Sequence, residues 1–344
     1  MEHETDMRAL SATSVPTVSA PPSSASIHTV ALPRWHSGEL ALPDPFVLES
    51  GQALRNARLA WQCAGPVDAP LVIALGGISA HRRVCADDAR SGWWQAQCGE
   101  QRALDTGQYR VLGIDWLGGV DDSSGPRDGE EFPAISTLDQ ARALLLLLNR
   151  LGVRRVHLLV GASYGGAVAQ HLALLLGERL RHLVLLSAAH RSAQFALALR
   201  HVQRAILGLG ADAPQALALA RSLAVLGYRT PEGIEQRFGD AEPVQPWLTH
   251  HGERFVARFN AAAYRCLGAS LDAHAFDPAA LSTPTTLFAV REDLIVPLSL
   301  LREFAAAAPR CTLVEISSNY GHDAFLKEEQ TVGALLRVAL EDAP

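Results

Sequence analysis

Short apolar runs that alternate with longer helical patterns constrain the fold of this 344-residue chain more than any other feature. Two segments of helical periodicity, 137–151 and 165–177, lie between such runs. Strands separated by helices form βαβ units, in which the strands pair in parallel. The sequence therefore predicts an α/β fold with a mostly parallel sheet and helices on both faces. The predicted buried strands are 69–77, 109–118, 153–161, 180–188, 284–290 and 311–317.

The alternation stops between about residues 190 and 280, where helical segments follow one another without a strand between them. These segments are RSAQFALALRHVQRAIL, APQALALARSLAVLGYR and GERFVARFNAAAYRCLGASLD. We interpret residues 191–280 as a helical cap inserted into a core formed by residues 36–190 and 281–344. The last segment, DAFLKEEQTVGALLRVALED, predicts a final amphipathic helix.

Residues 1–35 are rich in Ser, Pro, Thr and Ala, a composition typical of a disordered leader. Glu2, Glu4 and Asp6 lie where a secretory signal carries basic residues, and no apolar stretch follows them. The leucine run at 143–148 is far too short to span a bilayer. We therefore expect a cytoplasmic protein that does not contact membranes.

Composition excludes other classes of protein. Hydrophobic residues make up 48% of the chain and charged residues 19%, which favours a large folded core. The net charge of −6 offers no basic surface for nucleic acid. The 5 cysteines are scattered without C-x-x-C spacing, which favours reduced thiols over disulfides or a zinc site. We expect neither a metal nor a bound cofactor.

The segment GASYGG, residues 161–166, matches the pattern G-x-S-x-G between a predicted strand and a predicted helix. A sharp strand-to-helix turn strains its central residue towards positive φ, and small neighbours let the two elements approach. Ser163 would then present its hydroxyl at the carboxyl end of the sheet, with the N–H of Tyr164 directed at an oxyanion. The alternative is a glycine-rich turn with a serine N-cap. A phosphate loop is disfavoured because no lysine follows the glycines.

A nucleophilic serine needs a base and an acid, which follow it in the order acid, then histidine, in folds of this kind. SSNYGHDAFL places His322 on the loop before the last helix, and FAVREDLIVP places Asp293 after the penultimate predicted strand. Both loops leave the sheet at the same edge as Ser163. We therefore predict a Ser163, Asp293 and His322 triad, with Glu292 as the alternative acid.

The loop in ALGGISAH follows an early predicted strand and is expected to supply the second oxyanion donor. Its two glycines let the backbone approach a substrate closely. We predict that the donors come from residues 75–78, with Leu75 and Gly76 favoured. The alternative is an ordinary turn between a strand and a helix.

GASYGGAVAQHLA, DLIVP and GHDAFL resemble the signature segments of the homoserine O-acyltransferases of the MetX type, enzymes of methionine biosynthesis with the α/β-hydrolase fold. ALARSLAVLGYRT and HHGERFVARFNAAAYRCLGASLDAH resemble the cap helices of that family. The resemblance runs from about residue 35 to the end. It departs at residues 208–215, which form a shorter segment than usual, and at Tyr164, where Met or Phe is usual.

This resemblance implies ping-pong acyl transfer from an acyl-CoA co-substrate to homoserine, by an enzyme that dimerises through its cap. Arg221 matches the residue that holds the substrate carboxylate, and Asp323 the residue that holds its amino group. An amino acid carries one charge of each sign, so such a pair suits it. The alternatives are a solvated helix face for Arg221 and a helix N-cap for Asp323. Serine as acceptor, plain ester or thioester hydrolysis, and a non-catalytic role also remain open.

The acyl donor depends on whether the acyl pocket contains a cation, because a succinyl group ends in a carboxylate. In many succinyl-specific relatives an arginine lies two residues after the triad aspartate, where this chain has Ile295. That difference favours acetyl-CoA, but Arg291, or Arg82 and Arg83, could supply the cation from another side. The compact cap resembles a branch associated with succinyl transfer. We therefore predict succinyl-CoA as the donor, with acetyl-CoA as the alternative.

Overall fold

The structure is a computed structural model. Of the predicted leader, residues 1–35, all but Trp35 lie outside the residues that it describes. The described ranges are 35–87, 90–127, 131–209, 213–240 and 243–341.

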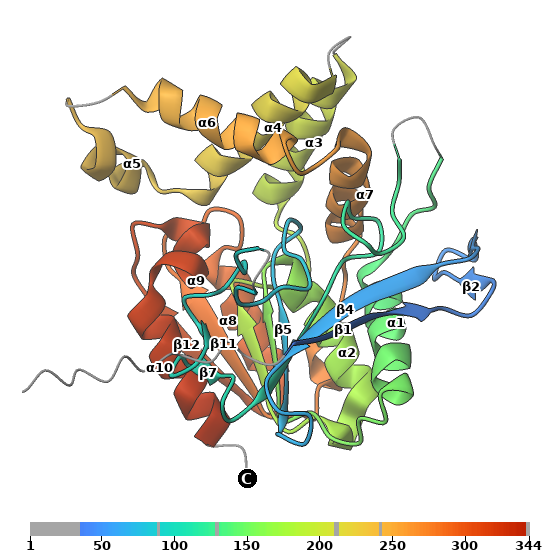
Figure 1. The fold of residues 1–344 in the computed structure, drawn as a ribbon. Coiled ribbons are helices and arrows are strands. Elements are labelled where there is room, and N and C mark those ends of the chain that lie inside the picture. The colour runs from blue at the N-terminus through green and yellow to red at the C-terminus, as the bar shows by residue number, and fades with distance from the viewer. Residues whose placement is uncertain (1–34, 88–89, 128–130, 210–212, 241–242, 342–344) are drawn as a thin grey trace, which may run out of the picture. The chain divides into compact units, whose positions relative to one another are not determined.

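An eight-stranded sheet forms the centre of the described chain (Figure 1). Strand β4 pairs antiparallel with both β1 and β8, and the remaining neighbours pair in parallel. All six apolar runs that predict strands contribute one to this sheet, which confirms the α/β class. In spatial order the strands are β1 (Trp35–Ala41), β4 (Arg58–Ala64), β8 (Arg110–Ile114), β5 (Leu71–Leu75), β9 (Leu158–Ala162), β10 (Leu183–Leu186), β11 (Thr285–Val290) and β12 (Cys311–Ile316).

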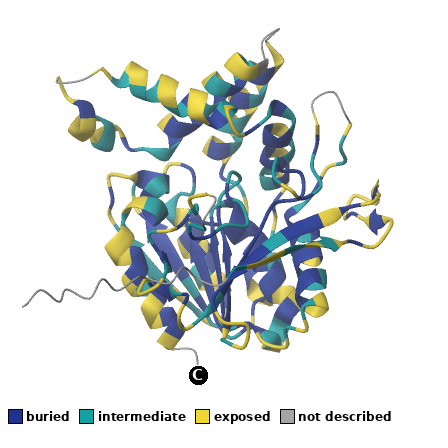
Figure 2. Cartoon of the chain, viewed as in Figure 1, coloured by how far each residue is buried: buried dark blue, intermediate teal, exposed yellow. Residues whose placement is uncertain are grey.

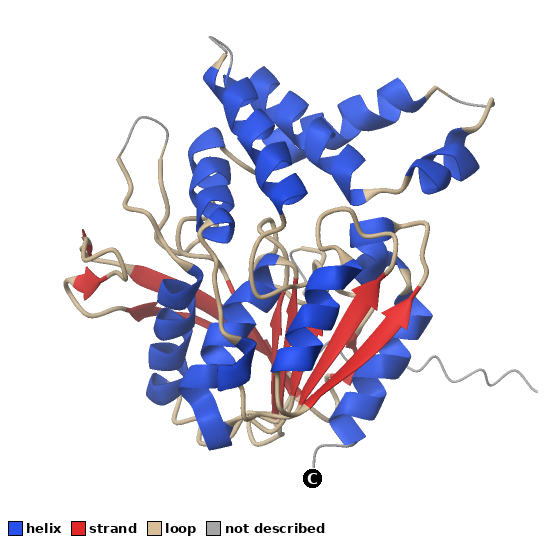
Figure 3. Cartoon of the chain, turned by 180° about the vertical axis from the view of Figure 1, so that it is seen from behind, coloured by secondary structure: helices blue, strands red, loops and turns tan. Residues whose placement is uncertain are grey.

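Helices cover both faces of the sheet because successive strand residues point to opposite sides. In β5, Ile73 and Leu75 join one core with helices α1 (Thr137–Arg150), α2 (Tyr164–Leu176) and α8 (Leu298–Ala307). Val72 and Ala74 join a second core against α10 (Glu329–Glu341). Figure 3 views the sheet from the side of α8, and Figure 2 shows the strands buried between the two layers.

The remaining short elements lie outside these layers. The predicted final helix divides at Glu328 into α9 and α10, because that residue leaves the helical region with φ −83° and ψ 59°. The short elements are β2 (Phe46–Val47), β3 (Ala53–Leu54), β6 (Cys98–Gly99), β7 (Leu104–Asp105), α9 (Ala324–Lys327) and the 3₁₀ turns at Gly177–Arg179, Pro278–Ala280 and Gly321–Asp323.

Five helices follow β10 before the chain returns to the sheet at β11, and they lie beyond the carboxyl ends of the central strands (Figure 1). The predicted helical segment at 252–272 is broken, because the Asn260 side chain caps a new helix by accepting the Ala263 N–H at 2.7 Å. None of the described helices is long and apolar enough to cross a membrane. The five are α3 (Gln194–Gly208), α4 (Ala213–Tyr228), α5 (Pro231–Phe238), α6 (Val244–Val256) and α7 (Ala261–Asp272).

Candidate active site

The turn between β9 and α2 holds Ser163 at φ 52° and ψ −117°, outside the regions that L-residues ordinarily occupy. A Cβ atom at Gly161 would lie 2.5 Å from the carbonyl oxygen of Gly165, and one at Gly165 would lie 2.3 Å from that of Leu75. Strand and helix therefore approach so closely that only glycine fits at these two positions. The corner has the strained form that the sequence predicts, and it presents the serine hydroxyl beyond the end of the strand.

Three side chains from distant segments form one hydrogen-bonded chain. Ser163 Oγ lies 2.9 Å from His322 Nε2, and His322 Nδ1 lies 2.8 Å from Asp293 Oδ2. The other carboxylate oxygen of Asp293 accepts the N–H groups of Ile295 at 2.8 Å and Val296 at 2.9 Å, which fixes its orientation. With Nδ1 donating to the carboxylate, Nε2 is left to accept the serine proton. This geometry suits the activation of a serine nucleophile.

The charges around His322 make its imidazole a stronger base. Burial alone would lower the pKa of His322, but the charge and hydrogen bond of Asp293 raise it above the ordinary value of 6.5. The Asp323 carboxylate adds to the increase, and the Arg200 guanidinium opposes it. The alternative acid, Glu292, lies apart from this network, since its carboxylate accepts the Ser318 N–H at 2.9 Å.

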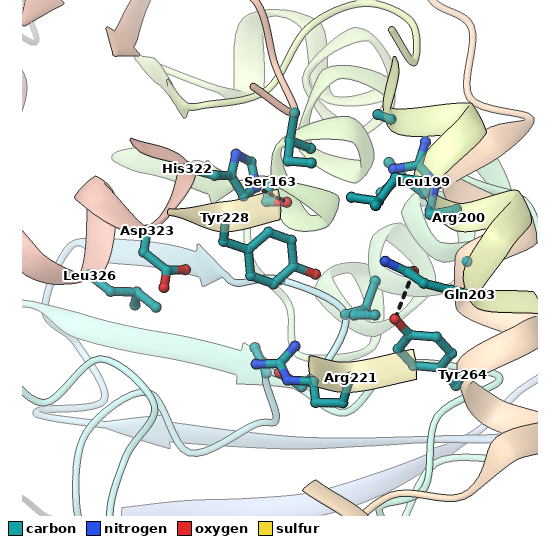
Figure 4. A pocket seen from close by; sticks show the side chains of 18 of the residues that line it. Ser163, Leu199, Arg200, Gln203, Arg221, Tyr228, Tyr264, His322, Asp323 and Leu326 are labelled. Atoms are coloured by element: carbon teal, nitrogen blue, oxygen red, sulfur yellow. Dashed lines mark hydrogen bonds between the residues drawn. The ribbon is translucent and has the colours of Figure 1, made fainter. Parts of the chain in front are cut away.

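A cavity of about 320 Å³ lies between the sheet and the cap helices, and Ser163 and His322 line it (Figure 4). Among the described residues of its wall, Asp323 is the acidic one, so positive charge is in excess. That excess favours an anionic ligand. The basic side chains of the wall are Arg200, Arg204, Arg221 and Arg258.

Arg221 and Asp323 both line this cavity, as the prediction of an amino-acid site requires. The Arg221 guanidinium lies 5.5 Å from the ring centre of Tyr228 and 4.8 Å from that of Phe255, and forms no ion pair with a described residue. Asp323 precedes α9, but its side chain makes no capping hydrogen bond. Its Oδ2 instead lies 3.0 Å from Nη2 of Arg229. Arg221 therefore faces the cavity and two aromatic rings rather than a solvated helix face, and the Asp323 side chain does not cap α9.

The backbone near Ser163 offers two candidate oxyanion donors. Tyr164 begins α2, so its N–H is among those without an acceptor inside the helix, while its buried hydroxyl bonds Ser270 at 2.9 Å. The predicted donors Leu75 and Gly76 are buried and do not line the cavity. Gly77 lines it instead, because the Gly76 carbonyl turns away to accept the Gly165 N–H at 2.8 Å.

Of the two predicted acyl-specificity residues, the structure places one in the cavity wall and the other outside it. Ile295 is buried and lines the cavity next to Ser163. Arg291 does not line the cavity: its side chain is 56% exposed, and its Nε lies 3.6 Å from Glu315. The prediction that Arg291 supplies a cation to the acyl pocket is therefore wrong, because a carboxylate on β12 holds the side chain outside.

Arg82 and Arg83 also fail to reach the cavity. Arg82 forms ion pairs with Asp115 and Asp122, and Arg83 Nε lies 2.7 Å from Asp87. The residues that sequence reasoning missed are Arg200, Arg204 and Arg258. Arg200 and Arg204 are one turn apart on α3, a spacing that predicts a shared helix face, but the sequence does not say that this face meets Ser163.

The strand order, the strained serine corner and the hydrogen-bonded Ser–His–Asp chain together define the α/β-hydrolase class. Residues 70–329 match the protein family described as alpha/beta hydrolase fold. Individual relatives narrow the assignment. The chain is 38% identical to a homoserine O-succinyltransferase of Xanthomonas campestris pv. campestris, over 96% of this chain and 91% of that protein. It therefore belongs to the homoserine O-acyltransferase family.

Two further comparisons agree with this family. The chain is 37% identical to a homoserine O-acetyltransferase of Thermus thermophilus, over 72% of this chain and 71% of that protein. It also superposes on the crystal structure of a homoserine O-acetyltransferase from Staphylococcus aureus with a TM-score of 0.79 and 25% identity. That superposition covers 88% of this chain and 94% of the other. Relatives of this chain thus include proteins named for both acyl groups.

Proposed function

We propose that this protein transfers the succinyl group of succinyl-CoA to the hydroxyl of L-homoserine, giving O-succinyl-L-homoserine and CoA for methionine biosynthesis. The observation that carries the proposal is the Ser163–His322–Asp293 chain in a cavity that also contains Arg221 and Asp323. A nucleophile and two charges of opposite sign therefore face one space. The proposal places the enzyme in the cytoplasm, with homoserine and acyl-CoA as its small-molecule partners.

In the first half-reaction, Ser163 Oγ attacks the thioester carbonyl carbon while His322 Nε2 takes the hydroxyl proton. The backbone N–H groups of Tyr164 and Gly77 stabilise the oxyanion that forms. The C–S bond then breaks, the sulfur takes the proton from His322, and CoA leaves as the thiol. An acyl ester of Ser163 remains.

In the second half-reaction, homoserine binds with its carboxylate on Arg221 and its ammonium on Asp323. His322 Nε2 takes the homoserine hydroxyl proton, and the oxygen attacks the acyl-serine carbonyl. The bond to Ser163 Oγ breaks, and His322 returns the proton to it. Because Asp323 adjoins His322 in sequence, the bound amino acid lies close to the base.

Two observations support the choice of substrates. The excess of arginine in the cavity favours a donor with an extra negative charge, and the Xanthomonas relative, similar over nearly the whole chain, is named a succinyltransferase. The unpaired Arg221 guanidinium and the Asp323 carboxylate match the two charges of an amino acid. Acetyl-CoA is the alternative donor. Serine is the alternative acceptor, because one methylene group changes binding by only about 1–3 kcal/mol.

A donor-by-acceptor grid tests the proposal, with succinyl-CoA or acetyl-CoA against homoserine, serine or no acceptor. We expect the highest kcat/KM for succinyl-CoA with homoserine, measured as CoA release and as the O-acyl product. Ser163→Ala should abolish both signals. CoA release at the same rate without an acceptor would instead identify a thioesterase. Failure of a fluorophosphonate to label Ser163 in the folded protein would indicate a non-catalytic role.

A further inference from the structure

A small side cavity of about 30 Å³ lies beside Ser163 and shares part of its wall with the main cavity. Both cavities have Ser163, Ile295 and Arg200 in their walls. Small side chains make up most of the remaining wall, which also includes Arg191 and His274. The small residues are Ala167, Ala188, Ala189, Ala193, Ala196, Ser187 and Ser192. The side cavity is thus a narrow space lined mainly by small side chains, with the Arg200 and Arg191 side chains in its wall, next to the hydroxyl that would carry the acyl group.

The Arg200 guanidinium is held in place on α3 with donors to spare. Its Nε donates to the Asp272 carboxylate, and its Nη2 donates to Ser192 Oγ at 2.8 Å. Nη1 has no partner among the described residues. Arg204 Nη1 lies 2.5 Å from the other Asp272 oxygen, so one carboxylate is shared by two guanidinium groups. A net positive charge therefore remains at this wall.

Arg200 also lies on the other side of Ser163 from Asp323. Figure 4 draws Asp323 to the left of Ser163 and Arg200 to the right. The Arg200 charge is close enough to influence His322: like burial it lowers the pKa of His322, against the larger opposing effect of Asp293. The site thus separates a carboxylate suited to an ammonium group from a guanidinium suited to a second carboxylate.

The inner wall of the side cavity contains a second unused donor. Ser187 is fully buried at the end of β10, with φ 47°, and its Oγ has no hydrogen-bond partner among the described residues. A buried hydroxyl without a partner destabilises the empty site, and an acceptor brought by a ligand removes that penalty.

We propose that Arg200, together with the hydroxyl of Ser187, binds the terminal carboxylate of the succinyl group and so selects a dicarboxylic acyl-CoA over acetyl-CoA. This inference rests on the acyl transfer proposed above. The terminal carboxylate carbon of a succinyl ester lies roughly 4 Å from the carbonyl carbon, across three C–C bonds of about 1.5 Å. It therefore needs a cation beside Ser163. Arg221 and Arg258 line only the main cavity, and Arg191 lines only the side cavity, where its Nη2 lies 3.2 Å from the exposed Glu303 carboxylate. Arg200 lines both cavities.

This arrangement explains why an isoleucine follows the triad aspartate. Ile295 Cδ1 approaches α4, where it would lie 3.3 Å from a Cβ atom at Gly227, so the residue forms an apolar wall between loop and cap. The guanidinium enters the same space from α3 instead of from the loop that carries Asp293.

The test compares kcat/KM for succinyl-CoA and acetyl-CoA, each with homoserine, in wild type and Arg200→Met. We expect the succinyl-CoA value to fall roughly 10- to 100-fold, the range for a lost hydrogen bond to a charged group, and the acetyl-CoA value to fall far less. Arg204→Met is the matched control, because it also contacts Asp272 but does not line the side cavity. Arg204→Met should change kcat/KM for succinyl-CoA and for acetyl-CoA by the same factor.

Two further variants guard against misfolding of Arg200→Met. Arg200→Lys keeps the charge but loses the planar fork of the guanidinium. The ratio of kcat/KM for succinyl-CoA to that for acetyl-CoA should therefore fall, but by less than in Arg200→Met. Ser187→Ala removes only an unpaired hydroxyl, so it should lower the succinyl-CoA value several-fold without loss of thermal stability. In Arg200→Met the acid limb of the pH profile should move to higher pH, because the charge that lowers the pKa of His322 is gone.

The outcomes separate this inference from the proposed function. The inference is wrong, and the acyl transfer stands, if the wild type acylates homoserine but prefers acetyl-CoA. The same holds if Arg200→Met lowers kcat/KM for succinyl-CoA and for acetyl-CoA by the same factor. If the wild type transfers neither acyl group to homoserine, the proposed function fails and the inference falls with it. A fall in kcat/KM of Arg200→Met that is confined to succinyl-CoA supports both the inference and the proposed function.

Discussion

His322 lies among three charged side chains that act on it in different directions. Asp293 bonds its Nδ1, Asp323 follows it in sequence, and Arg200 approaches from the cap. The carboxylates outweigh burial and the guanidinium, so the pKa of His322 is raised. An elevated pKa makes the neutral imidazole a better proton acceptor once the pH exceeds that pKa. Asp323 and Arg200, the residues proposed to bind the two substrates, therefore also influence the pH range over which His322 is neutral.

The raised pKa of His322 predicts how acyl loading of Ser163 depends on pH. The base must be neutral to accept a proton, so acyl loading should rise with pH through an apparent pKa above 6.5. Asp323→Asn removes a charge that raises this pKa, so its acid limb should move to lower pH. The measurement is the pre-steady-state burst of CoA release as a function of pH. Glu292→Gln, which alters a group bonded to Ser318 and not to His322, is the control and should leave the limb in place.

Elements differ in how far their local sequence specifies them. Helix α1 begins where predicted, because Ser136 and Asp139 form a reciprocal capping box. The predicted helix at 252–272 is two helices, because the Asn260 side chain caps the second one. Strand β4 was not predicted, since it is recognisable mainly from its pairing with β1 and β8.

The β9–α2 corner gives a prediction at the scale of elements. Gly165→Ala places a Cβ 2.3 Å from a backbone carbonyl oxygen, which α2 cannot avoid without moving away from β5. We expect a loss of about 1–3 kcal/mol in the free energy of unfolding, measured in urea, and a smaller CoA burst. Gly208→Ala at the end of α3 meets nothing within 4 Å and should not destabilise the protein. Equal stability of the two variants would contradict the close approach.

The helices between β10 and β11 supply one side of the cavity at Ser163 and also expose apolar side chains. The fractional exposure is 58% for Leu219 on α4 and 85% for Leu209 at the end of α3. Phe195 and Val202 on α3 are also about half exposed, and Figure 2 shows exposed segments along these helices. Exposed apolar side chains that gather on neighbouring helices are typical of an interface with another protein surface.

We therefore predict a homodimer that associates through α3 and α4. Light scattering coupled to size exclusion should give twice the mass of the chain for the wild type. Leu219→Glu should shift it towards the monomer, because burial of a charge at an interface is unfavourable. Val338→Glu on α10, a position exposed to a similar extent, is the control and should remain dimeric. A monomeric wild type would contradict the prediction.

The strands and the serine corner follow from local sequence. Apolar runs specified six of the eight strands, because buried parallel strands need continuous hydrophobic residues. The glycines around Ser163 predicted the corner, since no other residue tolerates that backbone and those contacts. Asp293 and His322 followed from loops that end at one edge of the sheet, and the structure brings both to Ser163.

The positions of the long charged side chains depend on the tertiary structure. Arg291 adjoins the site in sequence but pairs with Glu315 at the surface, while Arg200, on α3, lines the cavity beside Ser163 and pairs with Asp272. Likewise Gly77, and not Leu75 or Gly76, lines the cavity beside Ser163, and the Gly76 carbonyl bonds the Gly165 N–H. A strand or a turn is specified by its own neighbours along the chain. An arginine turns towards whichever carboxylate or cavity the fold brings near it, and those partners lie far away in sequence.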